Sequence, residues 1–141
     1  MAVNENIAGA VSGSVELKIP CRPEFVAVAR LTVSGVASRL SFSYEDIEDI
    51  KIAVAEACTY AIQSTAAAPD EIRILCAFND SHLVISVGNR QGTFKEGIKT
   101  GGVADAPSLG IFLIESLMDD VSYAEMEDGT GCIRMIKSLL R

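Results

Sequence analysis

The feature that most constrains the fold is an apolar periodicity over residues 44–62. Apolar residues recur there at intervals of three and four: Ile47, Ile50, Val54, Cys58, Ala61 and Ile62. This spacing puts them on one face of an α-helix. Ser43 precedes Tyr44-Glu45-Asp46, which is typical of an N-cap followed by acidic residues in the first turn. We expect a helix from Ser43 to near Thr65 whose apolar face packs on a second layer.

Strand patterns lie on both sides of this helix. Residues 14–19 alternate apolar and polar side chains, which predicts a half-buried strand. Residues 71–78 and 82–87 are rich in Ile and Val, and Asn79-Asp80-Ser81 between them is turn chemistry. Residues 121–126 and 132–139 form a second such pair around a Gly-rich turn at 128–131. Both pairs are typical of β-hairpins.

Two further helices complete the expected order. One begins at Pro23 and continues to about residue 40, since proline near a first helical turn costs little. Its expected inner residues are Phe25, Val28, Leu31, Val36 and Leu40. The other covers residues 109–118. The resulting fold class is α+β, a two-layer sandwich with one mixed, mostly antiparallel sheet of about five strands and three helices on one face. A doubly wound parallel sheet is not expected, because strict βαβ alternation is absent.

Length and composition favour one domain at residues 14–141, preceded by a loose Gly/Ala/Ser-rich tail at 1–13. The net charge of −7 argues against direct binding of nucleic acid. No apolar run approaches the ~20 residues that span a bilayer, and residues 1–14 lack signal-peptide features. Four cysteines without a C-x-x-C pair predict buried free thiols and a cytoplasmic location. The single histidine, His82, is expected to lie beside a turn without a special role.

Three local patterns offer chemistry, and each has an ordinary alternative. Glu56 lies among small apolar residues, either at the lip of a pocket or on the solvated helix face. Residues 89–107 form a long Gly-containing segment, a type that is usually functional or mobile. Ser108-Leu109-Gly110 opens a predicted helix, whose free N–H groups suit a phosphate. The alternative is an ordinary loop that ends at Ser108 as N-cap.

Three blocks of sequence make the chain recognisable: Leu31–Arg39, Ile47–Thr59 and Leu109–Val121. They closely resemble the RsbW and SpoIIAB group of bacterial anti-sigma-factor serine kinases. This group belongs to the ATPase superfamily of gyrase, heat-shock chaperones, histidine kinases and MutL. The resemblance extends from about Val15 to Leu139 and implies a histidine-kinase-like ATPase fold.

The resemblance also implies roles for particular residues. Glu56 matches the general base that prepares the attacking hydroxyl. The position four residues later, Tyr60, matches an asparagine that holds Mg²⁺ on the ATP phosphates. Asn89 matches the aspartate of an adenine-reading Asp-x-Gly motif. The glycines and the helix start that follow match the phosphate-binding segment of the family. They are Gly92, Gly101, Gly102, Ser108, Leu109 and Gly110.

The chain departs from this pattern at four positions. Tyr60 offers a phenol, a poor ligand for a hard cation. Asn89 lacks the charge of the aspartate, and Gln91 replaces the glycine of that motif. Pro107 removes a backbone donor where the family has consecutive glycines. We therefore hypothesise that ATP binding is weak or lost and that kinase turnover is slow or absent.

Three functions remain open at this point. The first is a regulatory protein that binds a sigma factor and/or an anti-sigma-factor antagonist without much nucleotide chemistry. The second is an active ATP-dependent serine kinase that phosphorylates such an antagonist. The third is a structural or dimerisation module. The resemblance further implies a homodimer, and neither membrane nor direct nucleic-acid contact is expected.

Overall fold

The structure is a computed structural model that describes residues 10–63, 71–89 and 106–139, with residues 106–108 described by their backbone alone. Its elements follow the predicted order. They are β1 (Gly13–Pro20), the 3₁₀ turn η2 (Pro23–Phe25), α1 (Val26–Ala37), α2 (Tyr44–Gln63), β2 (Glu71–Phe78), β3 (His82–Asn89), α4 (Ala106–Leu117), β4 (Asp120–Glu125) and β5 (Gly131–Ser138).

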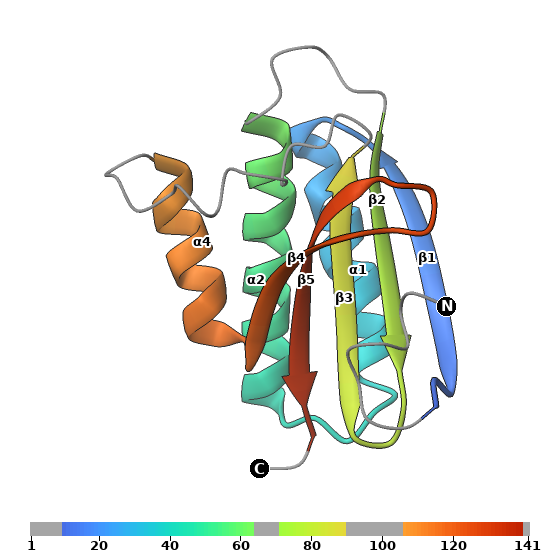
Figure 1. The fold of residues 1–141 in the computed structure, drawn as a ribbon. Helices are drawn as coiled ribbons and strands as arrows, with labels where there is room; N and C mark the ends of the chain where they lie inside the picture. Colours follow the sequence, from blue (N-terminus) through green and yellow to red (C-terminus); the bar gives the residue numbers. More distant parts are fainter. Residues whose placement is uncertain (1–9, 64–70, 90–105, 140–141) are drawn as a thin grey trace.

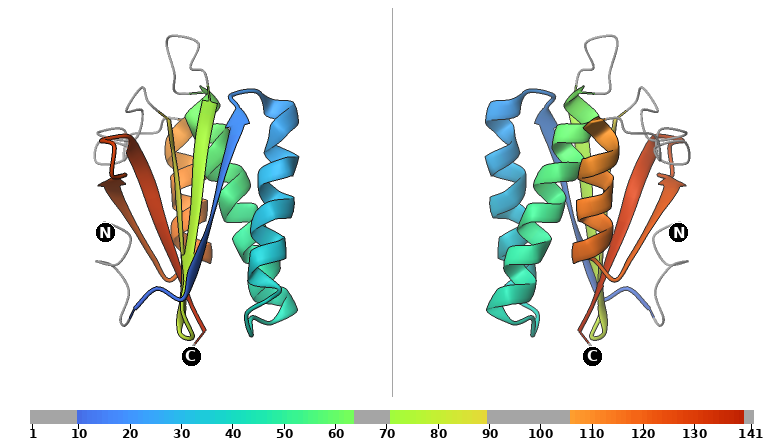
Figure 2. Two further views of the ribbon diagram at one scale, coloured as in Figure 1. Left: turned by 90° about the vertical axis from the view of Figure 1, so that its right-hand side faces the viewer. Right: turned by 90° about the vertical axis from the view of Figure 1, so that its left-hand side faces the viewer.

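The strands form one five-stranded sheet in the order β1-β2-β3-β5-β4 (Figure 1). The sequence predicts a mostly antiparallel sheet, and all four described strand pairings are antiparallel. The described helices lie together on one face of this sheet (Figure 2). The two-layer α+β architecture is therefore confirmed.

The main core lies between the helices and the sheet. Alternate residues of the strands point toward the helices, as the two-residue period of a strand requires. Fully buried strand residues in this layer include Ile72 and Ile74 of β2, Ile85 and Val87 of β3, and Ile133 and Met135 of β5. Among the helices, α2 contributes the most buried residues to this core. They include Ile50, Ala53, Val54, Ala57, Cys58 and Ala61.

Helix α2 begins as the sequence predicts. The backbone N–H of Asp46 donates to Ser43 Oγ at 3.0 Å, so Ser43 caps the helix and satisfies one of its unpaired donors. The helix ends at Gln63 in the described part of the chain, and the expected end near Thr65 lies outside the described residues.

The expected inner face of α1 is partly wrong. Its buried residues are Ala29, Val33 and Ala37, whereas Val28 and Leu31 are 40% and 72% exposed. Small residues face the neighbouring helix because α1 packs closely on α2. The longer apolar side chains at the other positions therefore point outward.

Helix α4 starts earlier than predicted. It begins at Ala106, so Ser108 is its third residue and cannot be its N-cap. Pro107 is its second residue, where the missing N–H would have no partner inside the helix.

The far end of α4 is held by a buried lysine. Lys137 Nζ donates to the Leu117 carbonyl at 2.5 Å and lies 3.8 Å from Asp49 Oδ2 and 4.0 Å from Asp46 Oδ1. Lys137 is 3% exposed, and a buried ammonium needs such partners. The end of α4 thus meets the start of α2, so the two helices run antiparallel.

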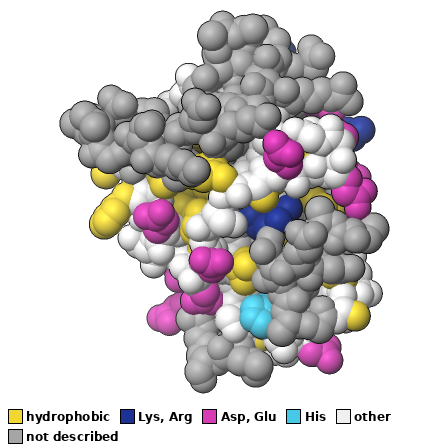
Figure 3. Space-filling view, viewed as in Figure 1, with side chains coloured by type: hydrophobic (Ala, Val, Ile, Leu, Met, Phe, Trp, Pro, Cys, Tyr) yellow, Lys and Arg dark blue, Asp and Glu magenta, His cyan; other side chains and the backbone are white. Residues whose placement is uncertain are grey.

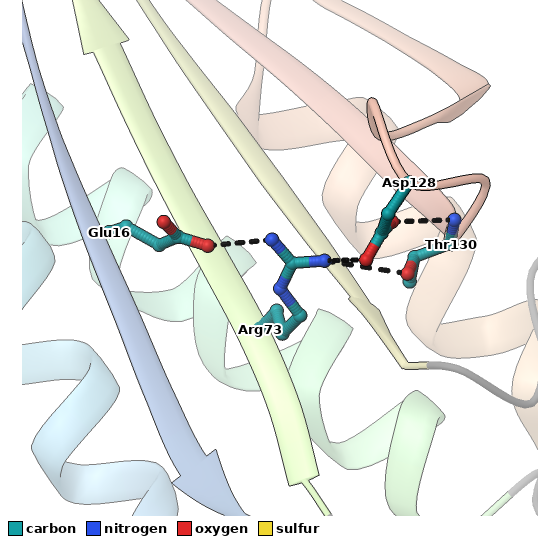
Figure 4. Close-up of polar contacts among 4 residues, drawn as sticks. All are labelled: Glu16, Arg73, Asp128 and Thr130. Carbon is teal, nitrogen blue, oxygen red and sulfur yellow. Dashed lines mark hydrogen bonds and ion pairs between the residues drawn. The ribbon is translucent and has the colours of Figure 1, made fainter.

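A polar cluster anchors the β4–β5 turn over the sheet (Figure 4). Arg73 of β2 donates to Glu16 Oε2 of β1 at 2.7 Å and also to the Asp128 carboxylate of the turn. Thr130 adds a 3.5 Å contact from Arg73, and its own N–H donates to Asp128 Oδ1 at 3.0 Å. Gly129 has φ of +88°, which favours glycine in this turn. The predicted hairpin is confirmed, but its tie to β2 was not foreseen.

The four cysteines are free thiols, as predicted. Cys58, Cys76 and Cys132 are buried, and Cys21 is partly exposed. No helix of the described residues is long and apolar enough to cross a membrane.

Candidate functional site

Helix α2 places Glu56 and Tyr60 one turn apart on neighbouring positions of one face, because residues four apart lie together on a helix. Glu56 is partly buried. Tyr60 is 6% exposed and belongs to the core between helices and sheet. The glutamate therefore has access to solvent, while the phenol is largely enclosed.

Helix α4 brings Gly110 against Glu56. A Cβ built on Gly110 would lie only 3.0 Å from Glu56 Oε1. This distance is tighter than an ordinary van der Waals contact, so the hydrogen side chain of glycine gives the carboxylate its room. Two of the predicted site residues, more than fifty positions apart in the sequence, are thus neighbours.

Asn89 lies at the end of β3 and is fully buried on the helix side of the sheet. Its Nδ2 donates to the Ala61 carbonyl at 3.5 Å, a long hydrogen bond to the residue that follows Tyr60. The amide is therefore oriented by α2. Helix α2 thus connects the predicted residues into one region, because Glu56 meets Gly110 of α4 and Ala61, next to Tyr60, meets Asn89 of β3.

Tyr123 of β4 is part of this region, and the sequence reasoning missed it. Burial raises the pKa of the Tyr123 phenol well above its usual value, and the nearby Tyr60 and Glu115 raise it further. Its Oη is buried and has no hydrogen-bond partner among the described residues. The alternation of Val121 and Tyr123 in β4 could have placed this ring on the helix side, since Tyr123 pairs with the core residue Ile133.

The remaining predicted site residues are not brought together by the described structure. Leu109 is 72% exposed at the start of α4, and the side chain of Ser108 is not described. Gly92, Gly101 and Gly102 lie outside the described residues, as does Gln91.

The donor set fits a dedicated Mg²⁺ site poorly. Among the described residues no group of three or more His, Cys, Asp or Glu side chains could hold a metal ion. Mg²⁺ prefers carboxylate, amide or water oxygens, and Tyr60 presents a phenol within the core. Glu56 is the one carboxylate among the predicted site residues, so no metal-dependent step follows from these side chains.

Comparisons with known proteins identify the family. The model of the histidine kinase-like ATPase domain matches residues 19–137. A serine-protein kinase RsbW from Oceanobacillus iheyensis is 40% identical over 126 aligned residues, which cover 76% of each chain. Another RsbW, from Bacillus pumilus, is 38% identical and covers 90% of this chain and 86% of its own.

Solved structures share the fold at low identity. The RsbU and RsbW domains of a Mycobacterium tuberculosis protein superpose with a TM-score of 0.66 at 16% identity, covering 89% of this chain and 32% of that one. The SiaB–SiaC complex of Pseudomonas aeruginosa gives 0.61 at 14% identity, covering 89% of each chain. With the fold, the matched domain model and the curated relatives in agreement, the chain belongs to the histidine kinase-like ATPase domain family and is RsbW-like within it.

Proposed function

We propose that this protein is an anti-sigma-factor-like regulator of a bacterial partner-switching system with weakened or lost ATP binding. It binds a sigma factor and/or an anti-sigma-factor antagonist through the fold that it shares with its RsbW relatives. Support for the protein partner comes from relatives named serine-protein kinase RsbW and from a structural neighbour solved as the SiaB–SiaC complex. The net charge of −7 suits a partner with a basic surface.

One observation carries the loss of nucleotide affinity, the burial of Tyr60 in the core. The resemblance calls for an amide oxygen at this position to hold Mg²⁺ on the phosphates. The phenol is 6% exposed, and its ring is held by core packing one turn beyond Glu56. A ring fixed there offers no suitable ligand and occupies volume beside the site, so both the metal and the phosphates lose favourable contacts.

Asn89 adds to this loss. An aspartate would supply a negative charge to an exocyclic amine of adenine, and a charge-assisted hydrogen bond is roughly twice as strong as a neutral one. Asn89 is neutral, and its amide group is oriented by a bond to the Ala61 carbonyl. Reorienting it toward a base would break that bond inside the core.

Isothermal titration with Mg-ATP tests the proposal. The unaltered protein is expected to show no micromolar affinity, and Tyr60→Asn is expected to gain affinity, because it restores the amide oxygen. Tyr44→Asn is the matched control, since Tyr44 lies on the same helix and is 77% exposed. Circular dichroism confirms that each variant is folded. Micromolar binding by the unaltered protein would overturn the proposal.

An active serine kinase is the second candidate, and the Glu56–Gly110 contact favours it. The glutamate that matches the general base is retained, and Gly110, which has only a hydrogen atom as its side chain, lies beside the Glu56 carboxylate. Transfer of labelled phosphate from ATP to a candidate antagonist, lost in Glu56→Gln, would establish this function. No transfer, together with retained binding of the antagonist, supports the regulator.

Location in the cytoplasm and assembly as a homodimer belong to the proposal as well. Light scattering at several protein concentrations measures the oligomeric state. A pull-down from the native cell extract followed by mass spectrometry tests the partner class, and recovery of neither a sigma factor nor an antagonist-type protein would contradict it.

A further inference from the structure

Helix α4 presents apolar side chains on two opposite faces. Ile111 and Ile114 are buried in the core. Leu109, Phe112 and Leu113, in contrast, are 72%, 66% and 37% exposed. Their spacing of three and four residues places them together on the side of the helix that is turned away from the core. These three residues are here called the α4 stripe.

The α4 stripe lies at the edge of the helix layer. Figure 2 shows α1, α2 and α4 side by side, with α4 at one end of the row. Hydrophobic side chains are visible along the margin of the molecule that α4 occupies (Figure 3). Ile52 of α2 is 42% exposed and lies one turn before Glu56, whose carboxylate meets Gly110 of α4. The exposed apolar surface therefore extends from α4 toward α2.

Such a group of exposed apolar residues differs from the usual protein surface. Single exposed apolar side chains are common and need no explanation, whereas groups of them mark interaction sites. Among the described residues, three of the exposed large apolar side chains fall within five positions of α4. The others are spread over β1, α1 and α2, and the pair Val28 and Leu31 of α1 is the nearest equivalent.

The surroundings of the α4 stripe are acidic. Residues 109–133 contain six acidic residues and no Lys, Arg or His. Glu115 is exposed one turn after Phe112, and Asp119 and Asp120 are exposed just after the end of the helix. Figure 3 shows acidic side chains beside the hydrophobic ones at this margin. The stripe is thus an apolar strip with carboxylates next to it.

The exposed pair Val28 and Leu31 of α1 has the opposite surroundings. Arg30 lies between the two residues in the sequence, and α1 contains no acidic residue. The two exposed apolar groups therefore resemble each other in polarity and differ in charge. This difference makes Leu31 a control for the α4 stripe, because Leu31 and Leu109 are both 72% exposed on a helix.

A second copy of this chain fits the α4 stripe poorly. A two-fold symmetric dimer places the same patch of both subunits against each other. Glu115, Asp119 and Asp120 would then lie close to the same carboxylates of the other copy, and like charges across an interface weaken binding. A partner with basic groups around an apolar centre would instead gain from these carboxylates.

We propose that the α4 stripe is a docking surface for a protein partner that presents an amphipathic helix, with apolar side chains flanked by Lys or Arg. Apolar residues at helical spacing suit the apolar face of a partner helix, and the carboxylates attract and orient its basic groups. The inference rests on the proposed function and deepens it, because it assigns a surface and a charge to the protein partner. Since Gly110 meets Glu56, a partner on the stripe lies beside the candidate site.

Fluorescence anisotropy with a labelled synthetic peptide tests this surface. The probe is an amphipathic helical peptide of Leu and Lys, and its charge control has Glu in place of each Lys. The Leu/Lys peptide is expected to bind the unaltered protein. Leu109→Ser and Phe112→Ser should each weaken this binding about tenfold, because each removes an apolar anchor, whereas Leu31→Ser should leave it unchanged. Absence of binding, equal binding of the Leu/Glu peptide, or equal weakening by Leu31→Ser overturns the proposal.

Two further measurements decide between possible occupants of the α4 stripe. If light scattering shows self-association that Phe112→Ser abolishes, a second copy occupies the stripe and the proposal is overturned. If Leu109→Ser lowers the midpoint of urea unfolding and Leu31→Ser does not, the chain itself packs on the stripe, which also overturns the proposal. An unchanged oligomeric state and an unchanged midpoint support an external partner.

Failure of this inference can be told apart from failure of the proposed function. The peptide assay needs no nucleotide, whereas titration with Mg-ATP tests the ATP site. A sigma factor or antagonist that binds the protein and is unaffected by Phe112→Ser would overturn the docking surface and leave the proposed function in place.

Discussion

Replacement of Tyr123 by phenylalanine is expected to stabilise the protein. The Tyr123 hydroxyl is buried and has no hydrogen-bond partner among the described residues. A buried polar group left unsatisfied costs about 1–3 kcal/mol, and phenylalanine removes the hydroxyl while it keeps the ring. The residue as a whole is only partly buried, so the lower end of the range applies. We therefore expect Tyr123→Phe to raise the free energy of unfolding by about 1 kcal/mol, although most substitutions lower it.

Urea unfolding followed by circular dichroism measures this change, and a thermal melt should show a rise of about 4 °C for a chain of this length. Tyr44→Phe is the control, because Tyr44 is 77% exposed on α2 and its change should stay within about 0.5 kcal/mol. A fall in stability for Tyr123→Phe would refute the reasoning, since the hydroxyl would then make a favourable bond.

The substitution Tyr123→Phe should also change how the free energy of unfolding depends on pH in the alkaline range. Burial, with Tyr60 and Glu115 nearby, holds the pKa of Tyr123 in the folded state above its value in the unfolded chain. The folded state therefore keeps the phenolic proton more tightly, and stability falls as pH rises above the unfolded pKa of about 10. The unaltered protein should lose stability above pH 10 more steeply than Tyr123→Phe.

Three further predictions concern strand β3, helix α1 and the β4–β5 turn. Gly88→Ala should cost about 1–3 kcal/mol in urea unfolding, because its Cβ would lie 2.3 Å from the Gly131 carbonyl oxygen, which β3–β5 pairing fixes. Gly35→Ala on α1, with nothing within 4 Å, should instead stabilise by about 0.5–1 kcal/mol, and a loss there would contradict the packing. Hydrogen bonds from Thr130 and the charge of Arg73 lower the pKa of Asp128 to about 2. The ionised Asp128 carboxylate therefore contributes to the free energy of unfolding above the unfolded pKa near 4, and this contribution should be lost as pH falls toward 2. If Asp128→Asn loses as much stability as the unaltered protein over this pH range, the prediction is refuted.

Local sequence was sufficient for the type and order of the helices and strands, though not for every boundary. The cap at Ser43 and the periodicity after it depend on residues within a turn or two, so α2 could be predicted without knowledge of its neighbours. The same holds for the turn at Asn79, whose Oδ1 accepts from the N–H groups of Ser81 and His82. The order of elements then led to a two-layer fold, because a one-sided sheet and amphipathic helices bury their apolar faces on each other.

The candidate site was predictable only as a set of residue types. The resemblance named Glu56, Tyr60, Asn89 and Gly110, but the chain segments that carry them are far apart in sequence. Their proximity depends on antiparallel packing of α4 on α2 and on the position of the end of β3 against α2. Tyr123 was missed for the same reason, since an alternating strand pattern does not say which helix lies over it.

The sequence by itself determined which segments become helices and strands, because capping, periodicity and turn chemistry are local. Tertiary structure alone decided which faces are covered. Leu31 and Val28 point outward because small residues of α1 meet α2, and Arg73 reaches Asp128 across 55 positions because the β4–β5 turn folds back over β2. Contacts of this kind depend on how layers pack in space, and a one-dimensional pattern of apolar residues carries no information on the neighbour that each face will meet.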